Sequence, residues 1–317
     1  MITAAGGPEV LALNDVPEPA YGPWDVLVEV RASAVNRADL MQRRGVYPAP
    51  HGAPSNVPGL EVAGVVAAAG AHVTRWRPGD RVMAIVGGGG NADRVALHER
   101  EAMRIPAGLD FAQAAAIPEV FMTAYDAIVL QGGLASGQWL AVNAVGSGVG
   151  TAAVQLAAAL GARSIGSARD ASKVERAKAL GLDRGGTDLA ATARAEQIEA
   201  SVLLDLVGGP GLAAALGVLR SQGTAVLVGL VGGAKCELVL PLILQRRLRI
   251  IGTVMRARPL EEKIAIARLF EDRVVPLFES GRLRPVVERV FPLAEIVAAH
   301  ALVESNQTFG KVVLDHA

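Results

Sequence analysis

The sequence contains one cysteine in 317 residues, Cys236, and only 4% aromatic residues. A single thiol cannot form an internal disulfide and cannot build a zinc site on its own. This is typical of a reducing compartment, so we expect a cytoplasmic protein. Because the chain is nonetheless 51% hydrophobic, its interior must consist mainly of Ala, Val, Leu and Ile, which favours helices packed on a buried sheet.

The sequence also has no net charge, and we expect neither a leader nor a membrane span. Lysine plus arginine and aspartate plus glutamate each number 31, so no net field attracts the chain to nucleic acid or to acidic lipid. Residues 1–7 lack a basic segment followed by an apolar one, and no run of about 18 apolar residues occurs. We therefore expect small-molecule partners, with no nucleic acid and no membrane.

Two patterns of hydrophobicity divide the chain. Residues 8–118 contain short apolar runs separated by glycine and proline, which predicts a strand-rich unit. From residue 119 short apolar strands alternate with amphipathic helices, which predicts parallel βαβ units. We therefore predict an α/β protein with a β-rich domain of residues 1–118 and 281–317 and a doubly wound, parallel-sheet domain of residues 119–280. In the second domain we expect strands at 139–143, 164–168, 202–206, 225–229 and 248–252, and helices at 148–160, 171–180, 210–220 and 260–280.

A glycine-rich turn lies between the strand at 139–143 and the helix that follows it. Glycines let a backbone approach a pyrophosphate, whose charge then meets the free amides and the positive end of the helix. Thr151 replaces the last glycine of the usual dinucleotide pattern, so the letters alone are weak support. The strand before and the helix after nevertheless favour nucleotide binding over a purely structural turn. The residues expected at the pyrophosphate are Gly146, Ser147, Gly148, Val149 and Gly150.

The end of the second strand indicates which nucleotide is bound. An acidic residue there would bind the ribose 2′-hydroxyl of NAD, but no carboxylate appears before Asp170. Ser167, Arg169 and Lys173 could instead hold a 2′-phosphate, because guanidinium and ammonium groups favour phosphate oxygens. We therefore predict NADPH as the cofactor. In the alternative interpretation, Arg169 and Lys173 are solvated charges at a helix entry.

Several segments together resemble one family. The chain resembles, over nearly its whole length, the NADPH:quinone oxidoreductases of the zeta-crystallin type, a zinc-free branch of the medium-chain dehydrogenase/reductase superfamily. The resemblance implies a GroES-like catalytic domain, completed by the C-terminal segment, and a Rossmann-type NADP-binding domain. The segments that carry it are residues 34–39, 43–48, 58–64, 79–82, 123–124, 146–150, 229–233 and 309–312.

The resemblance also implies that no metal is bound. Zinc-dependent alcohol dehydrogenases of this superfamily place cysteine where Asn36 stands and histidine where Leu60 stands. Neither side chain can ligate zinc, which needs several cysteine, histidine or carboxylate ligands. The five histidines form no spaced pair, so catalysis is expected to proceed without a metal.

The resemblance assigns catalytic contacts to Tyr47 and Asn36. The Tyr47 phenol could donate to the oxyanion that develops on the acceptor, while Asn36 donates an amide proton. The alternatives are structural, with Asn36 as a helix cap and Tyr47 as the anchor of a proline turn. Further contacts implied by resemblance alone are Thr123 near the nicotinamide, Gly229 and Val254 along the cofactor, and Lys311 near its phosphates.

Three functions fit the sequence. The first is metal-free reduction of quinones by NADPH, by hydride or single-electron transfer. The second is NADPH-dependent reduction of an α,β-unsaturated carbonyl or an enoyl thioester. The third is a redox-silent, crystallin-like or RNA-binding role, although the balanced charge argues against RNA.

Many relatives carry a phosphate-binding tyrosine near the position of Asp188, where a carboxylate would repel phosphate. We also expect a homodimer that pairs through the edge strand at 248–254.

Overall fold

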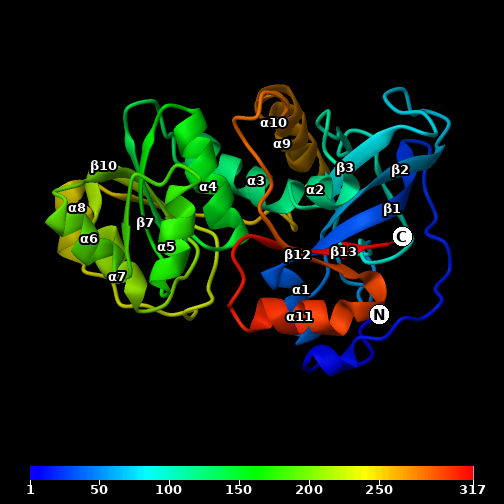
Figure 1. The fold of residues 1–317 in the computed structure, drawn as a ribbon, viewed down its shortest axis with the longest axis horizontal. Helices are drawn as coiled ribbons and strands as arrows, with labels where there is room; N and C mark the ends of the chain where they lie inside the picture. Colours follow the sequence, from blue (N-terminus) through cyan, green and yellow to red (C-terminus); the bar gives the residue numbers. More distant parts are fainter. Residues whose placement is uncertain (317) are drawn as a thin grey trace. The chain divides into compact units, whose positions relative to one another are not determined.

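The computed structural model describes residues 1–316, which fold as two compact units. Unit 1 comprises residues 1–122 and the chain from Met255 onward, and unit 2 comprises residues 123–254. The blue N-terminal and the red C-terminal segments of Figure 1 therefore belong to unit 1. The green and yellow segments form unit 2.

Unit 1 is built on a seven-stranded sheet whose strands come from both ends of the chain. Its central strand, β1 (Asp25–Val35), pairs antiparallel with β2 (Glu61–Ala69), with β4 (Arg94–His98) and with the C-terminal β13 (Lys311–Asp315). The main path runs β12-β13-β1-β2-β3-β5. The other strands are β3 (Arg81–Ile85), β5 (Met103–Arg104) and β12 (Val287–Pro292).

The core beside this sheet follows from the alternation of valines along β1. Because successive side chains of a strand point to opposite faces, residues two apart share a face. Val26, Val28 and Val30 are each at most 3% exposed and pack in one cluster with the valines of β2 and β3. The short helices of unit 1 are η1 (Pro8–Val10), α1 (Arg37–Arg43), α2 (Phe111–Ala115), η3 (Leu293–Glu295) and α11 (Ile296–Glu304). A further helix, α3 (Pro118–Tyr125), begins in unit 1 and ends in unit 2.

The second boundary between the units lies at residue 254 rather than at residue 280. The segment expected to be one long helix forms two, α9 (Leu260–Arg273) and α10 (Val275–Glu279). Both belong to unit 1, since Phe278 stacks edge-on against Phe121 with ring centroids 4.8 Å apart. The amphipathic pattern predicted the helices correctly, but a pattern does not say which sheet a helix packs on.

Unit 2 contains a six-stranded, all-parallel sheet in the order β11-β10-β9-β6-β7-β8. This is the doubly wound arrangement, in which the chain starts in the middle of the sheet and moves out to each edge in turn. The α/β fold class is therefore confirmed. Its elements are β6 (Trp139–Asn143), α4 (Gly148–Ala159), β7 (Arg163–Ser167), α5 (Ala171–Lys178), β8 (Arg184–Gly186), α6 (Leu189–Ala195), β9 (Ala200–Asp205), α7 (Gly211–Leu216), β10 (Leu219–Leu227), α8 (Leu240–Arg246) and β11 (Arg249–Gly252).

A wide helical turn that the sequence does not reveal follows α3. Residues Asp126–Gln131 form a π-helix, a conformation that is rare and often occurs at functional sites. Asp126 is 1% exposed and accepts a hydrogen bond from Thr253 Oγ1 at 2.9 Å. This bond connects the π-helix to the chain that follows β11 within unit 2.

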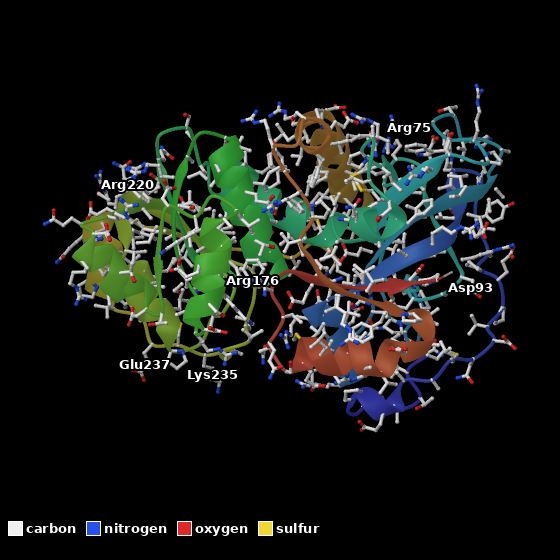
Figure 2. The ribbon with its side chains drawn as sticks, viewed as in Figure 1. Arg75, Asp93, Arg176, Arg220, Lys235 and Glu237 are labelled. Atoms are coloured by element: carbon white, nitrogen blue, oxygen red, sulfur yellow. The ribbon has the colours of Figure 1, made fainter. Side chains whose placement is uncertain are left out.

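Unit 2 carries charged side chains on its surface. Four of them are labelled in Figure 2, and all four are exposed: Arg176, Arg220, Lys235 and Glu237. Between Met1 and His316, no helix combines the length and the apolar character needed to cross a membrane.

Candidate active site

A buried lysine in unit 1 connects the first, second and last strands of its sheet. Lys311 begins β13, and its side chain is only 4% exposed. Its ammonium lies 2.7 Å from Glu61 Oε1 at the start of β2. It also donates to Asn36 Oδ1 at 2.6 Å and to the carbonyl of Val35 at 3.1 Å. Each of the three N–H groups of the ammonium therefore has a partner.

Asn36 is held in one orientation by this network. Its Nδ2 donates to Glu61 Oε1 at 2.9 Å and to the carbonyl of Ala34 at 3.2 Å, while its Oδ1 accepts from Lys311. Both amide hydrogens and the amide oxygen are thus engaged inside unit 1. In this arrangement Asn36 orients a buried ion pair and has no proton left to donate to a substrate, which differs from its expected role.

Lys311 also differs from its expected role. The resemblance places it near cofactor phosphates, but its ammonium is buried and fully hydrogen-bonded within unit 1. A buried carboxylate needs a cation nearby because desolvation penalises an unpaired charge. In this structure Lys311 supplies that cation to Glu61.

Asp39 supports the same region from α1. Its Oδ2 accepts from the amide of Asn36 at 2.8 Å, and its Oδ1 accepts from the amide of Gly59 at 2.9 Å. Burial raises the pKa of Asp39 to about 6, against the lowering effect of these two hydrogen bonds. The carboxyl thereby joins the first turn of α1 to the loop that precedes β2.

Two further charged residues belong to the site, and the sequence analysis did not identify either of them. Glu119, at the start of α3, donates its backbone amide to Glu61 Oε2 at 2.8 Å. Arg256 is 3% exposed, donates from Nε to the carbonyl of Gly87 at 2.8 Å and from Nη2 to Gln42 Oε1 at 2.6 Å. A glutamate in the first turn of a helix is ordinary in sequence, so only the tertiary contacts distinguish Glu119.

Tyr47 lies beside this group. The guanidinium carbon of Arg256 is 5.5 Å from the centroid of the Tyr47 ring, within the range of a cation–π contact. Burial raises the pKa of the Tyr47 phenol; the charge of Arg256 lowers it and that of Glu119 raises it. The phenol therefore stays protonated at neutral pH and can donate a hydrogen bond.

The glycine-rich turn of unit 2 has the geometry of a nucleotide turn. Ser147 is the N-cap of the twelve-residue helix α4, and its Oγ accepts from the amide of Gly150 at 3.0 Å. Ala144 adopts a left-handed conformation with φ of 56°, which is unusual for a residue with a side chain and often marks a functional turn. A Cβ at Gly150 would lie 2.4 Å from the carbonyl oxygen of Ala144, so this close turn requires glycine.

Of the residues predicted to select the nucleotide, Ser167 and Arg169 lie at the end of β7, and Lys173 lies in α5. Ser167, the last residue of β7, is 8% exposed, and Arg169 follows on the surface. Asp170 caps α5, and hydrogen bonds from the Ser172 hydroxyl and amide lower its pKa. Asp188 caps α6 by accepting from the amide of Ala191 at 2.9 Å. Both carboxylates therefore have structural partners.

The remaining predicted cofactor contacts lie in unit 2. Thr123 is 7% exposed and lies within α3, where its Oγ1 has no hydrogen-bond partner among residues 1–316. Gly229 lies against the backbone that follows β9, since a Cβ there would be 2.4 Å from the carbonyl oxygen of Leu206. Val254 is 53% exposed at the end of the unit. The orphaned hydroxyl of Thr123 is the one of these features that fits a bound ligand.

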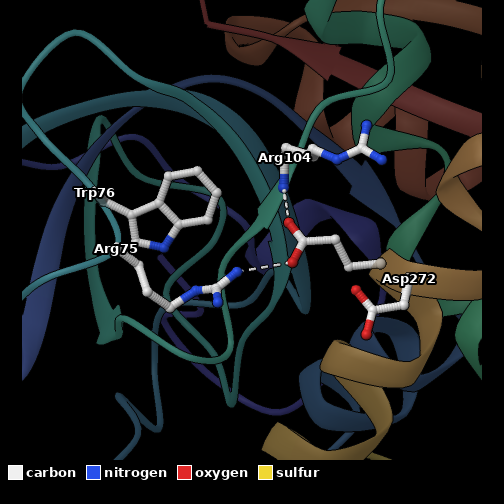
Figure 3. A pocket seen from close by; sticks show the side chains of 5 residues that line it. Arg75, Trp76, Arg104 and Asp272 are labelled. Atoms are coloured by element: carbon white, nitrogen blue, oxygen red, sulfur yellow. Dashed lines mark hydrogen bonds and ion pairs between the residues drawn. The ribbon is translucent and has the colours of Figure 1, made fainter.

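One open pocket of unit 1 is lined by none of these residues. It has a volume of about 410 Å³ and is lined by Arg75, Trp76, Arg104, Glu271 and Asp272 (Figure 3). Glu271 accepts from Arg75 Nη2 at 2.9 Å and from the amide of Arg104 at 2.8 Å. Its carboxylate is thereby used to fix α9 against the sheet, and no predicted site residue lines the pocket.

The residues of unit 1 do not fit a zinc ion. Leu60 is fully buried and apolar, and the oxygens of Asn36 and Glu61 already face the ammonium of Lys311. A metal ion at those oxygens would meet a positive charge less than 3 Å away from its ligands. Across the described part of the chain, no group of three or more His, Cys, Asp or Glu side chains is arranged to hold a metal.

The class of protein to which this chain belongs follows from comparison with known families and solved structures. Residues 22–124 match the family described as the alcohol dehydrogenase GroES-like domain, and residues 180–314 match the family described as zinc-binding dehydrogenase. The crystal structure of an NAD-dependent alcohol dehydrogenase superposes with a TM-score of 0.87 at 32% identity, covering 100% of this chain and 98% of that one.

Two curated relatives narrow the assignment. The quinone oxidoreductase of Pseudomonas aeruginosa is 31% identical over 322 residues, covering 98% of this chain and 97% of that protein. The spectinabilin polyketide synthase system protein NorB of Streptomyces orinoci is 34% identical over 331 residues, and this chain spans 99% of its own length but 14% of NorB. The chain belongs to the medium-chain dehydrogenase/reductase superfamily, and within it to the quinone oxidoreductase-like proteins. It is a nicotinamide-dependent oxidoreductase that acts on a small molecule.

The buried ion pair leads to a test by double-mutant cycle. Lys311→Met leaves Glu61 buried without a cation, and we expect it to lower the free energy of unfolding by about 3–5 kcal/mol. The double variant Glu61→Gln/Lys311→Met should lose less than the sum of the two single variants, because no charge remains unpaired. Urea unfolding at neutral pH measures all three, and additive losses would contradict the coupling.

Proposed function

We propose that this protein is an NADPH-dependent quinone reductase that works without a metal ion, in the cytoplasm as its single cysteine suggests. The observation that carries the proposal is the pairing of a neutral phenol with a buried guanidinium, Tyr47 and Arg256, on a scaffold that carries a nucleotide turn. Reduction of a quinone places negative charge on an oxygen. A phenol and a guanidinium both stabilise such charge by donating hydrogen bonds.

The residues of unit 2 fit a phosphorylated dinucleotide. The N-terminus of α4 and the close turn at Gly150 would receive the diphosphate, because first-turn amides have no intrahelical partner. Ser167 and Arg169, with Lys173 one turn further, would hold the 2′-phosphate. The carboxylates of Asp170 and Asp188 are engaged in helix caps, which reduces their competition for that position. When bound, NADPH supplies the hydride.

In unit 1, Tyr47 would donate a hydrogen bond to the acceptor oxygen, and Arg256 would supply positive charge. Arg256 Nη1 is buried and has no partner within residues 1–316, so one arm of the guanidinium is available. Lys311 and Glu61 would keep Asn36 fixed beside α1. Burial of the group keeps water from competing for these donors.

Reduction of an activated alkene is the second candidate. NorB, a polyketide synthase system protein, is as similar to this chain as the quinone oxidoreductase is. The enolate oxygen formed from an α,β-unsaturated carbonyl or an enoyl thioester would need the same donors as a reduced quinone. Acceptor preference therefore has to be measured.

The assay follows cofactor absorbance while chelator-treated protein meets an ortho-quinone, a para-quinone, an alkenal and an enoyl thioester, each with NADPH and with NADH. We expect the quinones to oxidise NADPH fastest, and Tyr47→Phe to slow quinone turnover by on the order of 10²-fold, because one oxyanion donor is lost. The affinity for NADPH should not change. Faster oxidation by the thioester would favour the second candidate, and no oxidation by any acceptor would favour a redox-silent role.

Arg169→Ala tests the choice of nucleotide. Loss of a charged hydrogen bond should weaken NADPH roughly 10- to 100-fold, while NADH binding stays within about twofold. Cofactor fluorescence titration measures both dissociation constants. Arg194→Ala, which removes an exposed arginine from α6 of the same unit, is the matched control and should change neither. Equal weakening of both nucleotides by Arg169→Ala would place the phosphate elsewhere.

We further propose a homodimer formed through the free edge of the unit 2 sheet. β11 ends the strand order, so its outer backbone groups have no neighbouring strand within residues 1–316. Apolar side chains are exposed around it: Ile250 at 36%, Val254 at 53%, Leu240 at 63% and Leu244 at 75%. An edge strand that pairs with its own copy across a two-fold axis covers such a surface on both subunits at once.

Ile250→Lys tests the dimer. A lysine on an edge strand opposes strand addition, so we expect the variant to elute as a monomer while the parent chain has twice that mass by light scattering. Val290→Lys is the control, because Val290 is 44% exposed on β12, the edge strand of the other sheet. A monomeric parent chain would refute the proposal.

A further inference from the structure

Glu119 carries an unused acidic group in the middle of the unit 1 site. Its Oε2 atom is buried and has no hydrogen-bond partner within residues 1–316. Its backbone amide is fixed by Glu61 Oε2 at 2.8 Å, so the residue itself is held in place. A buried carboxylate oxygen without a donor is costly when charged, whereas a protonated carboxyl can donate to a ligand.

The charges around Glu119 favour its neutral form. Burial is the largest effect, and together with the charge of Glu61 it raises the pKa of Glu119 to about 8. The surrounding groups come from β2, α1, β13 and the chain after β11, and they are Glu61, Asp39, Lys311 and Arg256. Two cations thus face three carboxyl groups. With its pKa raised to about 8, Glu119 holds a proton at neutral pH.

The two other carboxyl groups are committed to fixed partners. Glu61 accepts from Lys311, Asn36 and the amide of Glu119. Asp39 accepts from two backbone amides. Both therefore serve as acceptors in the structure, and only Glu119 has an oxygen with no assigned partner.

Glu119 also shares its surroundings with the proposed oxyanion donors. Its charge acts on Tyr47, and Arg256 acts on both Glu119 and Tyr47. Arg256 Nη1 and Glu119 Oε2 are each buried and unpartnered within residues 1–316. An unpaired donor and an unpaired acid group in one buried cluster are what a site needs in order to receive an anionic oxygen and protonate it.

We propose that Glu119 is the acid that protonates the reduced acceptor. The inference rests on the proposed function. Hydride transfer brings two electrons and one hydrogen to the acceptor and leaves negative charge on an acceptor oxygen, which Tyr47 and Arg256 stabilise. The O–H bond at Glu119 Oε2 then breaks, its electron pair stays on the carboxylate, and the proton forms the new O–H bond of the product. Solvent returns a proton to Glu119 before the next cycle.

The first test is independent of turnover. The pKa of Glu119 is about 8 in the folded chain and 4.5 without the fold, so the folded state binds more protons between these values and loses stability as the pH rises. Glu119→Gln does not titrate and keeps the neutral shape. We expect its melting temperature to equal that of the parent chain near pH 5 and to exceed it at about pH 9. No difference at the higher pH would overturn the proposal.

The second test is the pH profile of quinone turnover. For the parent chain, kcat should fall as the pH rises through about 8, because the acid form of Glu119 is lost. Glu119→Gln should lower kcat by on the order of 10²-fold, lose this pH limb and leave KM nearly unchanged. A variant that melts as expected but retains parental turnover and the same limb would show that the buried proton is not used, which also overturns the proposal.

Glu279→Gln is the matched control. Glu279 lies on α10 of the same unit and pairs with Arg104, away from the cluster. It should keep the parental pH limb and show no gain in melting temperature at high pH. Failure of the proposed function would appear in the parent chain, as no oxidation of either cofactor. Failure of the Glu119 role alone would appear only in the variant.

Discussion

The ammonium of Lys311, buried against Glu61 and Asn36, is the interaction on which the rest of unit 1 depends. Lys311 begins β13, Glu61 begins β2, and Asn36 directly follows the last residue of β1. Removing an ion pair from water costs several kcal/mol for each ion, which mutual attraction offsets only when every donor and acceptor is satisfied. That condition is met here, and the remaining oxygen of Glu61 holds the start of α3. One ion pair therefore links both ends of the chain to the helix that carries Glu119.

The same ion pair determines the electrostatics of its neighbours. Burial, followed by the charge of Glu61, raises the pKa of Glu119 to about 8, and the charge of Lys311 opposes this rise. Asp39 is compensated by two backbone hydrogen bonds and rises only to about 6. Two carboxyl groups with the same chemistry, those of Asp39 and Glu119, therefore have different pKa values. There are two causes: the backbone donates two hydrogen bonds to Asp39, and the charge of Glu61 raises the pKa of Glu119.

The sequence predicts well those features that depend on local pattern. The strand at 139–143 and the turn that follows it are where the pattern places them, because a buried parallel strand needs a continuous apolar run. The pattern is wrong about the unit to which residues 260–279 belong, since an amphipathic helix has an apolar face whichever sheet it meets. It finds Lys311 but not the contacts of Lys311 with Glu61 and Asn36, and it misses Glu119 and Arg256. Their importance comes from contacts with residues far away in the chain, such as Glu61 and Gln42.

The composition and the chemistry of this site are connected. A core of small aliphatic side chains has few polar groups, so the charges it does contain interact strongly and shift each other's pKa values. Leu60 stands where zinc-dependent members of the superfamily place histidine, and here it is a fully buried side chain that cannot ligate a metal. The buried cluster of this chain contains a fixed lysine, a guanidinium and a carboxyl whose pKa is raised by burial. A site of this kind suits acceptors that take hydride readily and need only stabilisation and a proton afterwards.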